Sequence, residues 1–314
     1  MKTRLITSLY ISIILILMFL TRLYTYYIFD AIILLLAIAG AIEIGKALEK
    51  IKKANTTMLL AIFPAAIIAG IYFGINFNWV WHQYLLMFLT VFIGFMLISA
   101  LLTMLFKSTT KKEMVRYKFE ASKGKYAVYK AVNTGFVFIY PTIFFISLIL
   151  LNHFSQLSFV KSAIAVDTIF FEWFICILAV FITVSTDSLA MIFGLLFKGP
   201  KLCPQISPKK TISGAIGGLA GGTLAALILY WIFIANPNFA IIINQIGGIW
   251  AVLALGFFGS VVCQLGDLCA SLIKRKARIK DYGSIFPGHG GVMDRADGLI
   301  ITSTFILATV IILL

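Results

Sequence analysis

One polar stretch near the C-terminus, residues 271–297, carries most of the side chains suited to chemistry. It reads SLIKRKARIKDYGSIFPGHGGVMDRAD and lies between two strongly apolar runs. Its three aspartates are Asp281, Asp294 and Asp297, and a fourth, Asp267, lies just upstream inside the apolar run. The stretch also holds His289, several lysines and arginines, and a glycine-rich turn. Carboxylates, cations and glycines this close together indicate a site that holds a polyphosphate through divalent metal ions.

The carboxylates favour a metal site. Asp294 and Asp297 share one face if a helix begins there. With Asp267 nearby, each pair of carboxylates repels by roughly 4 kcal/mol at 4 Å and an effective dielectric constant near 20. A divalent cation relieves that repulsion, and hard oxygen ligands suit Mg²⁺ or Ca²⁺. The alternative, helix capping by Asp294 alone, leaves Asp267 and Asp297 unexplained.

Two groups of glycines call for different interpretations. Gly288, Gly290 and Gly291 surround His289, and such a backbone approaches a phosphate closely with its N–H groups free to donate. The glycines between residues 214 and 222 recur every three or four positions, which indicates tight packing of helices. The sequence contains no Walker A loop and no dinucleotide-binding fingerprint.

Polar residues also recur inside apolar runs. A charged Asp at the centre of a membrane helix costs about 2.5–3.5 kcal/mol, so Asp187 and Asp267 indicate a polar cavity or a partner. Around Asp267, polar residues three or four positions apart predict a polar stripe along one helix. The stripe comprises Ser260, Gln264, Asp267, Ser271 and Lys274.

The composition predicts the elements that position these residues. The chain is 61% hydrophobic and 12% charged, with a mean hydropathy of +1.03, which is typical of an all-α polytopic membrane protein. Apolar runs predict about nine transmembrane helices: 5–20, 30–48, 58–75, 84–106, 132–151, 168–197, 213–235, 245–273 and 298–314. The net charge of +14 is explained by the positive-inside rule without invoking nucleic acid. The four cysteines lack the spacing of a zinc site.

The same rule predicts the orientation and the organisation of the chain. A cytoplasmic N-terminus places all of the 26 Lys and Arg residues except Arg22, Lys46 and Lys161 in cytoplasmic segments. We expect an N-terminal part, 1–131, with four spans and a basic loop, which either fixes the topology or binds anionic lipid. We expect a catalytic bundle of about five spans, 132–314, with cytoplasmic loops 198–212 and 274–297. In the second span, Glu43 either pairs with Lys46 or extends to the interface.

Several of these motifs together resemble the signature of phosphatidate cytidylyltransferases, also called CDP-diacylglycerol synthases. The resemblance covers about residues 185–298 and leaves the N-terminal half matched only in hydropathy. Two departures are Ser213, where the family often has glutamate after SPKKT, and Ala296, which replaces a larger apolar residue. The matching motifs are 187–190 DSLA followed by Gly194, 206–211 ISPKKT, 264–268 QLGDL, 271–275 SLIKR, 280–281 KD, 287–291 PGHGG and 294–297 DRAD.

The resemblance implies an activity and a set of roles. The family condenses phosphatidate with CTP, giving CDP-diacylglycerol and pyrophosphate, so positioning and electrostatic stabilisation replace a strong general base. It implies Mg²⁺ held by Asp267, Asp294 and Asp297, and it leaves open a second, monovalent ion. Lys280, Asp281 and Arg295 complete the implied catalytic set. The implied substrate-binding residues are Asp187, Ser207, Lys209, Lys210, Ser271, Lys274, Arg275, His289, Gly290 and Gly291.

The implied partners are CTP, phosphatidate and membrane lipid, with no nucleic acid, and the family suggests a homodimer. We expect the bacterial cytoplasmic membrane, with the site facing the cytoplasm. Two alternatives remain: a cytidylyltransferase acting on an isoprenoid ether lipid phosphate, and a Mg²⁺ transporter. A transporter is disfavoured because its broken helices recur in two symmetric halves, whereas the polar features here lie in the C-terminal part.

Overall fold

The computed structural model describes residues 13, 16–17, 19–22, 24–120, 122–164 and 166–314. These residues are mostly helical, and the strands among them form one two-stranded antiparallel sheet. Eight helical segments among them are long and apolar enough to cross a membrane. They overlap the second to ninth expected spans, and the all-α membrane class is confirmed. The first expected span, 5–20, lies mostly outside the described residues.

The described chain forms two compact units. The first comprises the residues up to Ile146 together with Lys276–Asp294, and the second comprises Ser147–Arg275 together with Arg295–Leu314. The sequence predicted two consecutive blocks, 1–131 and 132–314. That division of roles stays a prediction. The compact units interleave along the chain, because the polar segment after residue 275 packs with the N-terminal half.

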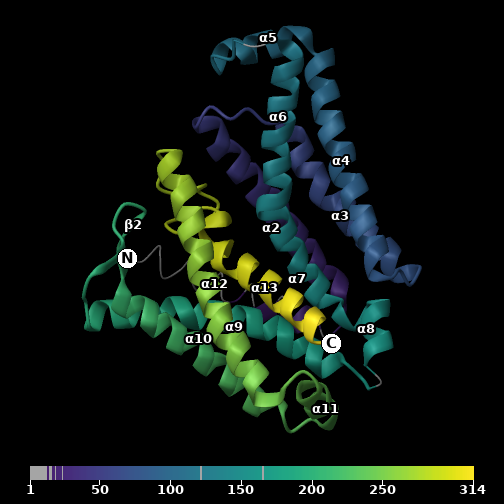
Figure 1. Ribbon diagram of the computed structural model, residues 1–314, viewed down its shortest axis with the longest axis vertical. Coiled ribbons are helices and arrows are strands. Elements are labelled where there is room, and N and C mark those ends of the chain that lie inside the picture. Colours follow the sequence, from purple (N-terminus) through teal and green to yellow (C-terminus); the bar gives the residue numbers. More distant parts are fainter. Residues whose placement is uncertain (1–12, 14–15, 18, 23, 121, 165) are drawn as a thin grey trace. The chain divides into compact units, whose positions relative to one another are not determined.

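The first unit is a bundle of apolar helices. Phe63, Phe95 and Phe138 form its aromatic centre, with ring centroids 4.0 to 5.9 Å apart. In Figure 1, α3 lies beside both α2 and α4, and α4 lies beside α6. The elements of this unit are α2 (Tyr26–Lys50), α3 (Thr57–Asn76), α4 (Trp81–Leu105), α5 (Lys107–Arg116), α6 (Lys123–Val137), the π-helix η1 (Phe138–Ile143) and the start of α7 (Phe144–Asn152).

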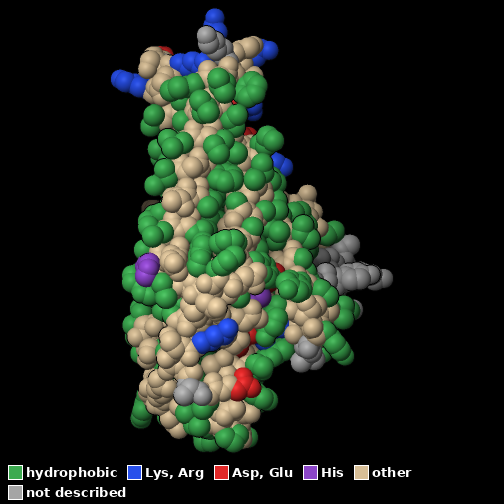
Figure 2. Space-filling model, turned by 90° about the vertical axis from the view of Figure 1, so that its right-hand side faces the viewer, with side chains coloured by type: hydrophobic (Ala, Val, Ile, Leu, Met, Phe, Trp, Pro, Cys, Tyr) green, Lys and Arg blue, Asp and Glu red, His purple; other side chains and the backbone are tan. Residues whose placement is uncertain are grey.

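Short polar connections fix the ends of these helices. The Thr25 side chain accepts a hydrogen bond from the Tyr27 N–H where α2 begins. Glu113 on α5 forms an ion pair with Lys130 on α6 at 2.8 Å, which ties the basic loop to the bundle. Figure 2 shows apolar side chains over much of the visible face, with Lys and Arg gathered at its upper end, where α5 lies.

The second unit holds the remaining helices and the sheet. Its elements after α7 are η2 (Phe154–Gln156), α8 (Ser158–Ala163), α9 (Ile169–Leu196), β1 (Lys201–Cys203), β2 (Ser207–Thr211), α10 (Ile212–Phe233), α11 (Pro237–Gln245), α12 (Gly248–Lys276) and α13 (Met293–Leu313). Helix α13 begins in the first unit and begins earlier than the expected span at residue 298. Asp294 and Asp297 therefore lie in its first turns, and the interhelical loop is shorter than the expected 274–297.

Helices α9 and α10 pack backbone against backbone, side by side in Figure 1. A Cβ atom on Gly221 would lie 2.6 Å from the Ser185 carbonyl oxygen, and one on Gly214 would lie 2.7 Å from the Ala190 carbonyl oxygen. Both distances are shorter than side chains tolerate. The interpretation of the 214–222 glycines as a helix-packing motif is confirmed. The packing also fixes the position of α9, the helix that carries Asp187.

We therefore expect Gly221→Ala to lower the free energy of unfolding by about 1–3 kcal/mol, the usual cost of overpacking. The measurement is the melting temperature of the detergent-solubilised protein, which should fall by several degrees. Gly94→Ala is the matched control, because a Cβ atom on Gly94 in α4 meets nothing within 4 Å. Equal melting temperatures for the two variants would contradict the close approach of α9 and α10.

Candidate functional site

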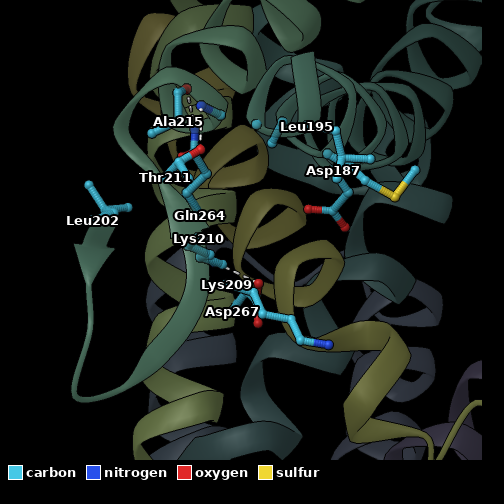
Figure 3. A pocket seen from close by; sticks show the side chains of 13 residues that line it. Asp187, Leu195, Leu202, Lys209, Lys210, Thr211, Ala215, Gln264 and Asp267 are labelled. Atoms are coloured by element: carbon cyan, nitrogen blue, oxygen red, sulfur yellow. Dashed lines mark hydrogen bonds and ion pairs between the residues drawn. The ribbon is translucent and has the colours of Figure 1, made fainter. Parts of the chain in front are cut away.

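A cavity of about 390 Å³ lies in the second unit, among α9, the β1–β2 hairpin, α10 and α12. Cavities of this size suit small-molecule ligands. Figure 3 shows the side chains of Asp187 and Asp267 pointing into the same space from α9 and α12. The polar side chains that line the cavity are Asp187, Lys209, Lys210, Thr211, Gln264 and Asp267. The cavity therefore combines anionic and cationic groups within largely apolar walls.

Three carboxylates gather in this unit from three helices. Asp297 on α13 is only 9% exposed and lies within electrostatic range of Asp267 and Asp187. Lys210 offsets part of this negative charge, because its Nζ lies 2.6 Å from Asp267 Oδ2. Lys274 acts electrostatically on Asp297 as well. The group is thus a mixed cluster in which acidic and basic side chains balance one another.

Small residues allow α12 and α13 to approach at this cluster. A Cβ atom on Gly266 would lie 2.8 Å from the Asp297 carbonyl oxygen. On α12, the Ser271 hydroxyl donates to Asp267 Oδ1 at 3.4 Å, which orients that carboxylate. Asp267 is therefore positioned both by its own helix and by the neighbouring one.

Two members of the polar stripe on α12 serve to join helices. The Ser260 hydroxyl accepts a hydrogen bond from Thr186 on α9 at 3.1 Å. The Gln264 amide donates to the Ala215 carbonyl oxygen on α10 at 3.2 Å, as Figure 3 also shows. The stripe thus has a structural part, towards Ser260, and a part that faces the cavity, at Gln264 and Asp267.

The β1–β2 hairpin carries the two lysines of the SPKKT motif into the site. Its strands pair Lys201 with Thr211 and Cys203 with Ser207. The Arg275 Nε on α12 donates to the Ile206 carbonyl oxygen at 3.0 Å. Arg275, which the resemblance assigned to substrate, thus holds the backbone of the hairpin.

The base of the hairpin is closed by hydroxyl groups. Thr211 caps α10 by accepting the Gly214 N–H at 3.1 Å. The Ser213 hydroxyl donates to the Lys198 carbonyl oxygen. The position at which the family often has glutamate thus lies in the first turn of α10 and holds the backbone at Lys198.

The glycine-rich loop belongs to the first unit. Asp294 Oδ2 accepts hydrogen bonds from the N–H groups of Tyr282 at 2.7 Å and Gly291 at 2.9 Å. Gly288 and Gly290 have positive φ angles of 76° and 88°, which glycine adopts without strain. The His289 N–H donates to the Phe286 carbonyl oxygen. The expectation of N–H groups free for a phosphate is therefore not met at His289 and Gly291.

The structure gives one acidic residue a role that sequence reasoning did not offer. Glu43 on α2 is 5% exposed, and its two carboxylate oxygens accept the N–H groups of Val292 and Met293 at 3.1 and 2.9 Å. Lys46, with which pairing was one of the two expectations, is exposed and acts electrostatically on Glu43. The only signal in the sequence was the carboxylate itself, inside an apolar span.

The predicted site residues divide between the two units. The second unit brings together Asp267, Asp297 and Asp187. Asp294 belongs to the first unit, so its expected convergence with Asp267 stays a prediction. The second unit holds Asp187, Ser207, Lys209, Lys210, Asp267, Ser271, Lys274, Arg275, Arg295 and Asp297; the first holds Lys280, Asp281, His289, Gly290, Gly291 and Asp294. Lys280 and Asp281 are both exposed.

The donor atoms of the acidic cluster fit a hard divalent cation, since all of them are carboxylate oxygens. In the part of the chain that the structure describes, no group of three or more His, Cys, Asp or Glu side chains forms a ready-made metal site. Mg²⁺ in nucleotide sites is bound through one or two carboxylates together with substrate phosphates. A pair such as Asp267 and Asp297 therefore suffices for this chemistry.

The amino-acid sequence is similar to those of known proteins. The model of a family described as the cytidylyltransferase family matches residues 2–313. The chain is similar to a phosphatidate cytidylyltransferase of Rickettsia conorii, with 43% identity over 119 residues, or 38% of this chain and 50% of that protein. It is also similar to a phosphatidate cytidylyltransferase of Brucella abortus, with 44% identity over 116 residues, or 37% of this chain and 39% of that protein. The chain thus spans half or less of the length of these relatives.

The anchoring of the hairpin gives a prediction that is independent of activity. We expect Arg275→Met to speed tryptic cleavage after the lysines of residues 198–210 by about tenfold, because a hydrogen bond from a charged donor contributes about 1.5–3 kcal/mol. Fragment masses after brief digestion in detergent measure the rate at these sites alone. Arg278→Met, which removes an exposed arginine from the following loop, should leave the rate unchanged. Equal rates in the two variants would show that Arg275 does not hold the hairpin.

Proposed function

Since the chain belongs to the cytidylyltransferase family, we propose that it transfers the cytidylyl group of CTP to phosphatidate, forming CDP-diacylglycerol and pyrophosphate. The observation that carries the proposal is the mixed cluster of Asp187, Asp267 and Asp297 beside Lys210, at the edge of a cavity in an apolar bundle. Its acidic and basic groups suit a nucleoside triphosphate, and its apolar surroundings suit a lipid substrate. Relatives named phosphatidate cytidylyltransferase support this choice of substrates.

The reaction joins two anions. A phosphate oxygen of phosphatidate attacks the α-phosphorus of CTP, a new P–O bond forms, and the bond between the α-phosphorus and the bridging oxygen breaks. The electron pair leaves with pyrophosphate. Because the attacking oxygen is already anionic, no residue needs to remove a proton from it. The protein must instead hold the reactants in line and offset their charge.

We assign the holding of the reactants and the offsetting of their charge to residues according to the charge of each side chain. We assign the neutralisation of the triphosphate and of the lipid phosphate to a set of cations. Asp187 and Asp281 contact the nucleotide, Ser271 orients Asp267, and His289 with Gly290 and Gly291 lines the phosphate pocket. Ser207 contributes from the start of β2. The cations are Lys209, Lys210, Lys274, Arg275, Lys280 and Arg295, of which Arg275 acts through the hairpin as well.

The family and the donor set together imply Mg²⁺. Asp267 and Asp297, with Asp294, are the residues that would hold it, and a second, monovalent ion is compatible with the same carboxylates. When bound, the ion supplies positive charge to the α-phosphate and to the leaving pyrophosphate. The chain's own part is to keep Asp267 and Asp297 close together inside an apolar bundle.

The setting of the reaction follows from the apolar helices. We propose that the protein lies in a bacterial cytoplasmic membrane with the cavity facing the cytoplasm, where CTP is found. The distribution of Lys and Arg supports this orientation. A homodimer, as the resemblance suggests, belongs to the same proposal.

Pyrophosphate release by the purified protein tests the proposed function. We expect release only when CTP, phosphatidate and Mg²⁺ are all present, with each omitted in turn as a control. A panel containing an isoprenoid ether lipid phosphate decides the lipid class, and a preference for it would replace phosphatidate in the proposal. Absence of release with every lipid, together with Mg²⁺ uptake into proteoliposomes, would favour the transporter instead.

Removing single charges tests the assigned roles. We expect Asp267→Asn and Asp294→Asn each to lower kcat by about 10²–10³-fold, as the loss of an electrostatic group in an active site does. The fold should survive Asp294→Asn, because an asparagine carbonyl oxygen still accepts the N–H groups of Tyr282 and Gly291. Glu120→Gln, at an exposed position, is the control and should keep full activity. Near-normal turnover in either aspartate variant would defeat its assignment.

A further inference from the structure

Glu43 holds the segment that leads into α13. It lies on α2 in the first unit, and Val292 and Met293, about 250 positions later, donate their N–H groups to its Oε1 and Oε2 at 3.1 and 2.9 Å. The side chain is 5% exposed. One buried carboxylate thus uses both oxygens on two successive backbone donors.

Those donors are groups that a helix leaves unsatisfied. The first N–H groups of an α-helix have no partner within the helix, and the helix dipole favours a negative group beside them. Hydrogen bonds to an ionised carboxylate are shorter and stronger than neutral ones. Glu43 therefore fixes the place at which α13 begins.

The loop before α13 is shaped around the same carboxylate. At Gly283 and at Gly291, the space that a Cβ atom would fill is occupied by Glu43 Oε1. Glycine is needed at these positions because the carboxylate lies directly against the backbone. Gly283 has no part in the proposed phosphate pocket, so the contact with Glu43 accounts for its small size.

A second carboxylate holds the loop through different donors. Asp294 Oδ2 accepts the N–H groups of Tyr282 and Gly291. Gly291 is therefore in contact with Glu43 at its Cα and with Asp294 through its N–H. The loop that carries His289 and Gly290 is closed by two acidic side chains, one from α2 and one from α13.

We propose that Glu43 is a positioning residue for nucleotide binding: it fixes the loop of residues 281–293, in which His289 and Gly290 meet the CTP phosphates. This inference rests on the proposed function, because it assigns Glu43 to the reaction proposed above. Glu43 itself touches no substrate. Its effect passes through the backbone of the loop, so it should alter the binding of CTP and leave the binding of the lipid unchanged.

The test compares variants that differ in one feature of the carboxylate. Glu43→Gln keeps the size and one oxygen acceptor but sets an NH₂ group against a backbone N–H. Glu43→Asp keeps the charge on a side chain one methylene shorter. Gly283→Ala leaves Glu43 unmutated, but its added methyl group displaces the Glu43 carboxylate. Glu49→Gln, a less buried carboxylate on the same helix, is the matched control.

We expect Glu43→Gln to lower kcat/KM for CTP by about 100-fold, since a misplacement of about 1 Å costs that much. The KM for CTP should rise while the KM for phosphatidate stays within about twofold. Glu43→Asp should recover part of the loss, Gly283→Ala should show the same pattern more weakly, and Glu49→Gln should match the wild type. Hydrogen exchange should speed up in peptides covering 281–293 and stay unchanged in α3.

Each other outcome overturns the inference. A Glu43→Gln enzyme with the wild-type KM for CTP shows that the loop does not depend on Glu43. Faster exchange throughout the first unit, or equal rises in both KM values, shows a role in general stability only. Effects of Gly283→Ala and Glu43→Gln that add fully in the double variant show that the two residues act independently. If wild-type protein releases no pyrophosphate, the proposed function itself fails, a result distinct from an active enzyme indifferent to Glu43.

Discussion

The constraint on which this structure depends is the cost of placing carboxylates inside an apolar bundle. Asp187, Asp267 and Asp297 lie close enough to repel one another, and each stands on a helix whose other residues are largely apolar. The Lys210–Asp267 ion pair relieves only part of that repulsion. Lys274, which acts electrostatically on Asp297, and Arg295, which acts on Asp187, offset more of it. The cost of burying these carboxylates is thus offset by basic side chains that lie beside them.

The first unit uses acidic side chains in a different way. Glu43 and Asp294 each accept two backbone N–H groups, four in all. Backbone donors have fixed directions, so a carboxylate that accepts two of them determines the path of the chain. Such a pair gives a glycine-rich loop one conformation despite the freedom of its glycines. Acidic side chains therefore lie beside basic side chains in the second unit and hold backbone donors in the first.

Features that depend on local spacing could be predicted from the sequence. The apolar runs predicted the second to ninth spans, and the 214–222 glycines predicted the close packing of α10. Asp267 and Asp297 could be expected to meet because each stands near the polar end of an apolar helix. The role of Glu43 could not be predicted, because its partners lie about 250 positions away and are backbone atoms, which carry no sequence signal. The interleaving of the two units could not be predicted for a related reason: the contacts of residues 276–294 are non-local.

In the β1–β2 hairpin, contacts of the backbone determine where the Lys210 side chain begins, so the position of its charge does not depend on side-chain length alone. Lys210 reaches Asp267 from a short strand anchored by Arg275 at the Ile206 carbonyl oxygen, and Thr211 begins α10 directly after it. Anchoring the strand limits the positions that the Lys210 backbone can take. Less conformational entropy is therefore lost when Lys210 forms the ion pair. Ser213 extends this arrangement, because its hydroxyl fixes the Lys198 carbonyl group at the base of the hairpin. The departure from the common family pattern at residue 213 therefore falls at a position that shapes the hairpin. A short hydroxyl side chain there reaches the backbone at Lys198, and so helps to hold the strand that carries Lys210.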